Sequence, residues 1–134
     1  MSSQVVVAEN GQGRYQQAVQ AGQHHLIADE PASIGGGDAG PAPFDFVMAG
    51  LGACTSMTLR MYAERKALAL TKISVVLSHQ KVDVEGSQRD HIARIITLEG
   101  DLSPEQRQRL LEIAQKCPVH RALAQSMLLT CTLL

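Results

Sequence analysis

Two cysteines of this 134-residue chain stand in settings that favour different chemistry. Cys117 comes directly before Pro118, which predicts that it occupies the N-cap of a short helix starting at that proline. The helix dipole and the unpaired backbone N–H groups there would stabilise a thiolate, and His120 and Arg121 would add to this field. This segment alone leaves two interpretations open: a reactive thiol, or a small buried residue at a tight corner. Cysteine is nevertheless a poor cap compared with Ser, Asp or Asn.

Cys54 lies within an apolar run that predicts a long helix from Phe44 to about Ala67. Apolar surroundings make a thiol inert, so core packing is the simpler interpretation of this residue taken alone. Gly50 and Gly52 keep the helix narrow at this point, which would let another backbone or a small ligand approach closely.

Arg14 and Asp45 are weaker candidates among the charged residues. Arg14 falls in a predicted strand and is otherwise read as a solvent-exposed strand residue. Asp45 falls in the first turn of the long helix, where an acid also interacts well with the helix dipole. It precedes Cys54 by nine residues, which is a rise of about 14 Å and roughly the opposite face. Asp45 can therefore meet Cys54 only if the helix starts later or a partner chain intervenes.

A zinc site is a weaker interpretation of the same region. Cys117 and His120 have Cys-x-x-His spacing, and His24, His25 and Asp29 are further potential ligands. No second close pair of ligands accompanies the first, so metal binding is disfavoured and no cofactor is expected. Cys131 lies in a β-prone stretch and is predicted to be a packing residue.

Composition excludes several classes of partner. Hydrophobic residues make up 45% and charged residues 19%, which is typical of a globular protein and fits one domain over residues 1–134. The net charge of −1 and the 3% aromatic content give no reason to expect nucleic acid as a partner. No signal peptide and no transmembrane segment are recognised, so no membrane is expected and the cytosol is the predicted compartment.

The elements that would position these residues indicate an α+β fold. The long helix is apolar on nearly all sides through Met57, so we expect a second subunit to cover part of it. A capping box at Ser103-Pro104-Glu105-Gln106 starts another helix, which ends near Lys116. The predicted strands are Gln4 to Ala8, Arg14 to Gln20, His24 to Ala28, Thr71 to Val84, His91 to Leu98 and Met127 to Leu134. The linkers are the Gly- and Pro-rich loop from Asp29 to Pro43 and the polar hairpin connection EGSQRD, and a last short helix runs from Pro118 to about Ser126.

The run PFDFVMAGLGACTSMTLRMYAERK, followed by CPVHRAL some sixty residues later, resembles the OsmC/Ohr family of thiol-dependent peroxidases. Within that family the chain is most similar to the OsmC-like bacterial branch related to YhfA. The resemblance implies the OsmC-like fold and an intertwined homodimer, with two long central helices between sheets built from both chains.

The resemblance also implies roles for the two cysteines. The residue matching Cys54 attacks the peroxide, and the residue matching Cys117 resolves the sulfenic acid as a disulfide, which an external dithiol of the lipoyl or thioredoxin type reduces. In the family, an Arg from the N-terminal strands and a Glu before the long helix hold the thiolate. Here Asp45 stands where the Glu is expected, and Arg14 is the best-placed Arg although the family's Arg-Asp-Gly context is missing.

The resulting hypothesis is a homodimeric, cysteine-based peroxidase acting on organic hydroperoxides, with hydrogen peroxide as a further candidate substrate. The apolar helix face around Cys54 suits an alkyl hydroperoxide. The alternative is a non-peroxidase OsmC-like protein, either a redox sensor or a binder of a small hydrophobic molecule. The sequence gives no role to His24, His25, Asp29 or His120.

Overall fold

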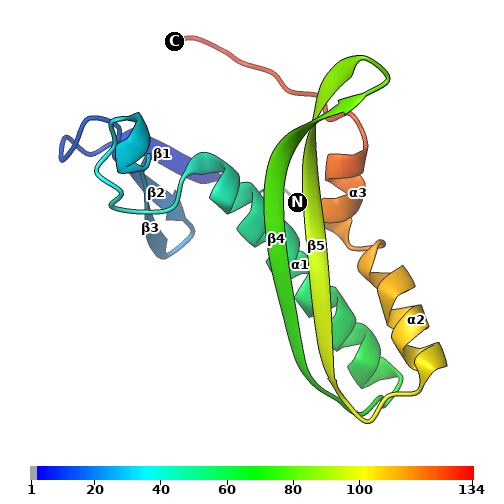
Figure 1. The fold of residues 1–134 in the computed structure, drawn as a ribbon. Helices are drawn as coiled ribbons and strands as arrows, with labels where there is room; N and C mark the ends of the chain where they lie inside the picture. The colour runs from blue at the N-terminus through cyan, green and yellow to red at the C-terminus, as the bar shows by residue number, and fades with distance from the viewer. Residues whose placement is uncertain (1–2) are drawn as a thin grey trace. The chain divides into compact units, whose positions relative to one another are not determined.

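The computed structural model describes residues 3–134, and the chain divides into two compact units at Val47/Met48. Figure 1 labels the helices and strands of both units. The first unit holds β1 (Val5–Glu9), β2 (Gln17–Ala21), β3 (His24–Ala28), the short helix η1 (Ala32–Ile34) and the start of α1 (Pro43–Arg65). The second holds the rest of α1, β4 (Leu70–Val84), β5 (Ser87–Gly100), α2 (Pro104–Ala114) and α3 (Pro118–Ala124). Among the described helices, none combines the length and hydropathy that a membrane crossing needs.

The first unit is built on an antiparallel sheet in the order β1-β2-β3. The third strand has the predicted bounds, but β2 begins at Gln17 rather than at Arg14. The cause is local: the Asn10 side chain accepts the Gln12 N–H at 3.0 Å and donates to the Gln16 side chain at 2.8 Å. These bonds hold the chain in a loop through residue 16. The prediction that Arg14 lies in a strand was therefore wrong.

The Gly- and Pro-rich loop is organised by Asp29, a residue for which no role was predicted. Its carboxylate accepts the Ala39 N–H at 3.0 Å and the Glu30 N–H at 2.8 Å, and only 4% of the residue is exposed. These donors, that of Ala39 first, lower the pKa of Asp29. Gly36 and Gly40 pass close to the backbone, since an added Cβ would lie 2.0 Å and 2.1 Å from carbonyl oxygens. The Asp29 carboxylate thus stabilises the loop by accepting hydrogen bonds from its backbone.

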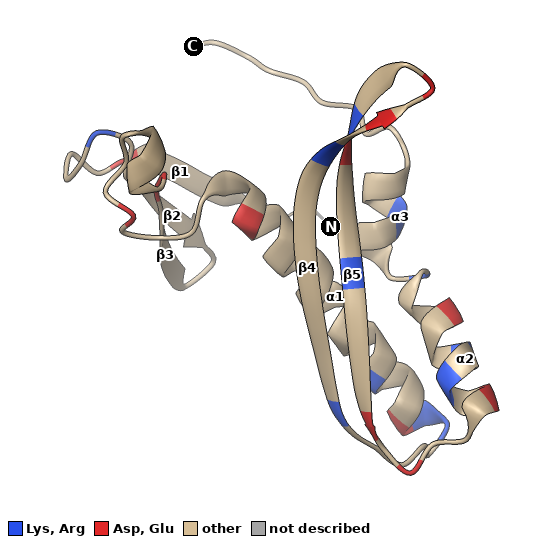
Figure 2. Ribbon diagram, viewed as in Figure 1, with Lys and Arg blue, Asp and Glu red and all other residues tan. Residues whose placement is uncertain are grey.

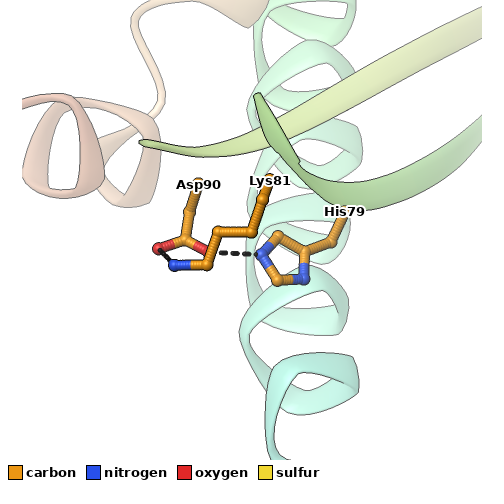
Figure 3. Close-up of polar contacts among 3 residues, drawn as sticks. All are labelled: His79, Lys81 and Asp90. Atoms are coloured by element: carbon orange, nitrogen blue, oxygen red, sulfur yellow. Dashed lines mark hydrogen bonds and ion pairs between the residues drawn. The ribbon is translucent and has the colours of Figure 1, made fainter. Parts of the chain in front are cut away.

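The long β4–β5 hairpin forms the two-stranded sheet of the second unit. Its connection is a two-residue turn at Glu85 and Gly86, both with positive φ (51° and 84°), which matches the twist of antiparallel strands. The six-residue connection predicted from EGSQRD was too long, because β5 already pairs at Ser87. Near this turn Asp90 accepts from His79 at 2.8 Å and from Lys81 at 3.1 Å across the hairpin, as Figure 3 shows.

Buried residues recur every four positions along α1: Leu51, Thr55, Leu59 and Ala63. This spacing gives one helix face, and its C-terminal part packs in an apolar cluster with β4 and α2. The cluster comprises Leu59, Ala63, Leu70, Leu110, Ile113 and Ala114. Charged residues of both signs occur on α2, near the hairpin ends and at the C-terminal end of α1 (Figure 2).

The α2 helix starts as the sequence predicts. Ser103 Oγ accepts the Gln106 N–H at 3.1 Å, and the Gln106 side chain accepts the Ser103 N–H at 2.9 Å, which completes the capping box. The helix ends at Ala114, and the corner that follows leads directly into α3.

The C-terminal strand predicted from Met127 to Leu134 is absent from the described residues. The segment leaves α3 without pairing with any described strand and runs outward (Figure 1), with Leu128 91% exposed. A strand needs a hydrogen-bonding partner, and β-prone side chains alone do not supply one. The long helix also keeps an uncovered face, because Met57 and Met61 are 60% and 65% exposed.

Candidate thiol site

Cys117 caps α3, as its position before Pro118 predicts. The residue is 0% exposed, and its Sγ accepts the backbone N–H of His120 at 3.3 Å. The backbone oxygen of Cys117 accepts the Arg121 N–H at 3.1 Å and so begins the helical bonding. The Cys117 side chain thus serves as the N-cap of α3.

Cys54 has a different setting, on α1 and half-buried. It comes one residue before the buried Thr55, and three residues before the exposed Met57. At Gly52 an added Cβ would lie 2.7 Å from Leu77 Cδ1 of β4, so the expected close approach is made by a side chain. All three cysteines, which lie in the described part of the chain, are free. Cys131 is exposed, so the prediction that it packs was wrong.

Arg94, which was not among the residues predicted from the sequence, joins the segments that carry the two cysteines. Its Nη1 donates to Thr55 Oγ1 on α1 at 2.8 Å and to the carbonyl oxygen of Ala114 on α2 at 3.4 Å. Its Nη2 pairs with Nδ1 of His120 on α3. Thr55 in turn donates its hydroxyl proton to the Leu51 carbonyl at 2.7 Å. Three helices are thus tied to β5 by one guanidinium group.

The pairing with Arg94 defines the state of His120. A guanidinium has only N–H donors, so His120 Nδ1 must accept, which leaves the ring neutral with its proton on Nε2. Burial first, and the Arg94 charge second, lower the pKa of His120 below 6.5. Arg94 therefore supplies positive charge at the corner between α2 and α3, whereas the sequence predicted that His120 and Arg121 would supply it.

The two other predicted site residues, Arg14 and Asp45, belong to the first unit. Arg14 is exposed and its guanidinium lies 5.0 Å from the centroid of the Tyr15 ring. Asp45 is exposed in the first turn of α1, where its carboxylate accepts the Ala42 N–H at 2.9 Å. Both cysteines belong to the second unit, whereas Arg14 and Asp45 belong to the first.

Comparison with known proteins decides the family. A family model described as OsmC-like protein matches residues 35–132. The chain belongs to the OsmC-like family. This confirms the resemblance seen in the two cysteine motifs. Among curated proteins, none matches the chain.

Solved structures show the OsmC-like fold over nearly the whole chain. An OsmC-like protein from Mycoplasma pneumoniae has a TM-score of 0.77 at 16% identity, covering 92% of this chain and 88% of that one. The organic hydroperoxide resistance protein OsmC from Legionella pneumophila has a TM-score of 0.69 at 19% identity, covering 92% and 89%. The organic hydroperoxide resistance protein OhrB of Bacillus subtilis has a TM-score of 0.64 at 20% identity, covering 91% and 90%. The predicted α+β class and OsmC-like fold are confirmed.

One sequence signal marks Arg94 in this OsmC-like protein. Ile92, Ile96 and Leu98 share the inward face of β5, and Arg94 has the same parity in the strand. A charged residue at a core-facing position needs a partner, and Thr55 supplies one from the buried stripe of α1. Arg94 and Thr55 are each a polar residue at an inward position of an otherwise apolar pattern. This is the sequence signal that could have predicted their contact.

The weaker zinc interpretation finds no support in the described residues, among which no group of three His, Cys, Asp or Glu side chains could hold a metal ion. His24 and His25 lie on β3 of the first unit, and both are exposed. His120 and Cys117 are linked through a backbone N–H rather than through the imidazole, whose Nδ1 is engaged by Arg94.

Proposed function

We propose that this OsmC-like protein is a cysteine-based peroxidase that reduces organic hydroperoxides, with hydrogen peroxide as a second candidate substrate. The observation that carries the proposal is the pair of free thiols in one compact unit, on segments that Arg94 joins. Two similar solved structures bear the name organic hydroperoxide resistance protein, which supports the substrate class.

In the proposed reaction the Cys54 thiolate attacks the O–O bond of the hydroperoxide. Cys54 becomes a sulfenic acid, and the alkoxide that leaves takes a proton to become the alcohol. Cys117 then attacks the sulfenic sulfur, which forms the disulfide and releases water. An external dithiol of the lipoyl or thioredoxin type reduces this disulfide by exchange, restores both thiols and is itself oxidised. No metal or organic cofactor takes part, and the dithiol implies a reducing compartment such as the cytosol.

The surroundings of the two thiols suit this order of events. Cys54 is only half-buried, so a small apolar hydroperoxide can reach it. Cys117 is fully buried and its sulfur accepts a backbone N–H, which fixes the position of the sulfur for the attack in the second step.

In this proposal Arg14 supplies positive charge to the Cys54 thiolate and Asp45 orients it, within a homodimer whose subunits each form one OsmC-like domain. The uncovered α1 face at Met57 and Met61 supports the homodimer, because apolar surface of this kind favours a partner. Light scattering after size-exclusion chromatography should give twice the chain mass, and a monomer at micromolar concentration would contradict the homodimer.

The peroxidase proposal is tested with reduced protein, tert-butyl hydroperoxide and either dihydrolipoamide or reduced thioredoxin, while peroxide loss is followed. We expect Cys54→Ser to lower the rate at least about 100-fold, because the nucleophile is lost. A wild-type rate no higher than that of Cys54→Ser would refute the proposal. The faster of the two dithiols identifies the class of reductant.

A second candidate function is binding of a small hydrophobic molecule. An apolar cavity of about 260 Å³ lies in the second unit, lined by Leu59, Ile96, Leu98, Leu110 and Leu111 with Arg107 at its edge. Titration of free thiols after one equivalent of peroxide separates the candidates. Loss of two thiols per chain supports redox function, whether as peroxidase or as sensor, and slow peroxide turnover then marks the sensor. An unchanged thiol count with a retained apolar molecule supports binding.

A further inference from the structure

We propose that Arg94 is a positioning residue for disulfide formation, the second step of the proposed reaction, and that it does not act in peroxide attack. The inference rests on the proposed pairing of Cys54 with Cys117. It is based on the positions of the three acceptors to which Arg94 donates hydrogen bonds.

Two of these hydrogen bonds end on residues that flank Cys117 at the corner between α2 and α3. Ala114, whose carbonyl accepts from Arg94, is the last residue of α2 and lies three residues before the cysteine. His120, which accepts from Arg94 through Nδ1, lies three residues after it, and its own backbone N–H donates to Cys117 Sγ. The corner is thus held to β5 on both sides of the sulfur.

The third bond of Arg94 ends on the residue that follows the other cysteine. Thr55 follows Cys54 directly, and its hydroxyl accepts from Arg94 at 2.8 Å while donating to Leu51 at 2.7 Å. With both of these bonds made, the hydroxyl is fixed in orientation, and Thr55 is 0% exposed. One rigid, planar donor group therefore relates the turn that carries Cys54 to the corner that carries Cys117.

Disulfide formation is sensitive to such a relation. The bond requires Cα atoms within about 4.4–6.8 Å and a narrow range of dihedral angles. A misplacement of about 1 Å can slow a reaction about 100-fold. In this step Cys117 sulfur attacks Cys54 sulfur, the S–O bond breaks, and the hydroxyl leaves as water after gaining a proton. Peroxide attack involves Cys54, the charged groups proposed to assist it and a small molecule that diffuses in, so it does not depend on the placement of the corner that carries Cys117.

The polar cluster has a cost that an apolar one would not have. Replacing a buried, hydrogen-bonded charge by well-packed apolar side chains is often neutral or stabilising for a fold. Here the inward positions on α1 and β5 hold Thr55 and Arg94, and their bonds converge on the Cys117 corner. A role in geometry, beyond stability, accounts for that choice.

The test separates the two steps in a single turnover. Reduced protein, freed of dithiol, receives one equivalent of tert-butyl hydroperoxide, and peroxide loss, dimedone-trapped Cys54 sulfenic acid and disulfide are followed together. In Arg94→Met we expect peroxide loss within about threefold of wild type, disulfide formation slowed at least about tenfold, and the dimedone adduct increased. Arg94→Lys should behave like Arg94→Met, because a compact ammonium group cannot span the three acceptors that are arranged around the planar guanidinium.

Other variants keep the test decisive if Arg94→Met does not fold. His120→Leu removes one acceptor and should slow disulfide formation, whereas His120→Asn keeps an acceptor and should restore it. Arg60→Met is the matched control, because Arg60 donates instead to the Leu70 carbonyl of β4 at 2.7 Å. It should leave the disulfide step unchanged. Equal disulfide rates in wild type, Arg94→Met and His120→Leu would overturn the inference, as would full rescue by Arg94→Lys.

A second oxidant distinguishes failure of this inference from failure of the peroxidase proposal. Diamide oxidises two thiols to a disulfide, with its N=N bond reduced to the hydrazine, and needs no O–O cleavage. If wild type ignores peroxide but forms the Cys54–Cys117 disulfide with diamide, the peroxidase proposal fails, and slower formation in Arg94→Met still supports the positioning role. If diamide closes the disulfide equally fast in both proteins, the positioning role fails.

Discussion

Cys54 and Cys117 belong to the same compact unit but are held in opposite ways. Cys54 projects from the middle of a helix, half-buried, between a buried stripe and the exposed Met57. Cys117 sits at a helix start, fully buried, with a backbone N–H on its sulfur and Arg94 holding the chain on both sides. Cys54 is therefore the more accessible thiol, and Cys117 is the more rigidly held one. An attacking cysteine needs access for the peroxide, and a resolving cysteine needs a fixed position.

The largest expected difference between the two thiols is their rate of alkylation in the folded protein. In a Cys131→Ser background, iodoacetamide should label Cys54 at least about 100-fold faster than Cys117, because a fully buried sulfur reacts only after local opening. Peptide mapping by mass spectrometry measures both rates. The rates should converge in denaturant, and equal rates without denaturant would break the comparison.

The next largest effect concerns the partner of Arg94 on the Cys54 side. Thr55→Val keeps the shape of the side chain but leaves an Arg94 donor without its acceptor, so we expect a loss of about 1–3 kcal/mol in the free energy of unfolding. Thr58→Val, on a half-buried position of the same helix, is the control and should change it by less than about 0.5 kcal/mol. Urea denaturation measures both, and equal losses would show that the bond to Arg94 adds nothing.

On the Cys117 side the effect of the cap is smaller. Cys117→Ala removes the acceptor of the His120 N–H and should cost about 1 kcal/mol, whereas Cys117→Ser keeps an acceptor and should retain most of the stability. Thermal unfolding of the two variants distinguishes a cap from simple packing of the sulfur. If serine destabilises as much as alanine, the packing of the sulfur outweighs its hydrogen bond.

The pH dependence of the free energy of unfolding should be the smallest effect. His120 should act in one pH range, and Asp29 and Asp90 in a lower one. The fold keeps His120 neutral, because burial and Arg94 lower its pKa, so stability falls as pH drops below 6.5 and the unfolded chain binds a proton first. Asp29 and Asp90 have lowered pKa values, from backbone N–H donors and from His79 with Lys81 respectively. Their contribution is present above pH 3.8 and is lost below it.

Melting temperatures at a series of pH values measure both ranges. His120→Asn should flatten the first range and leave the second in place. The exposed His91→Asn on β5 is the control and should leave both ranges unchanged. A first range that persists in His120→Asn would mean that another group titrates there.

Local patterns allowed much of the fold to be predicted. The capping box at Ser103, the cap at Cys117 and the Gly- and Pro-rich loop depend on residues close in sequence, and the structure contains all three. The start of β2 was missed, since hydrogen bonds of the Asn10 side chain outweigh the apolar pattern there. The C-terminal strand was also missed, because pairing depends on a partner strand that propensity does not reveal.

The candidate site was predictable only in part for the same reason. Both thiols and the cap follow from sequence motifs, but Arg94 meets Thr55 across 39 positions and His120 across 26, and no local pattern gives such contacts. Its inward parity among Ile92 and Ile96 was the available signal. Placing Arg14 and Asp45 beside a thiol depended on the family resemblance alone.

The central claim, that Cys54 attacks and Cys117 resolves, is tested most directly by a single turnover of Cys117→Ser with one equivalent of tert-butyl hydroperoxide. We predict peroxide loss within about threefold of wild type, a stable Cys54 sulfenic acid trapped by dimedone, and steady-state turnover with dithiol lowered at least about tenfold. Loss of the first turnover in Cys117→Ser, together with its retention in Cys54→Ser, would reverse the assignment and contradict the account.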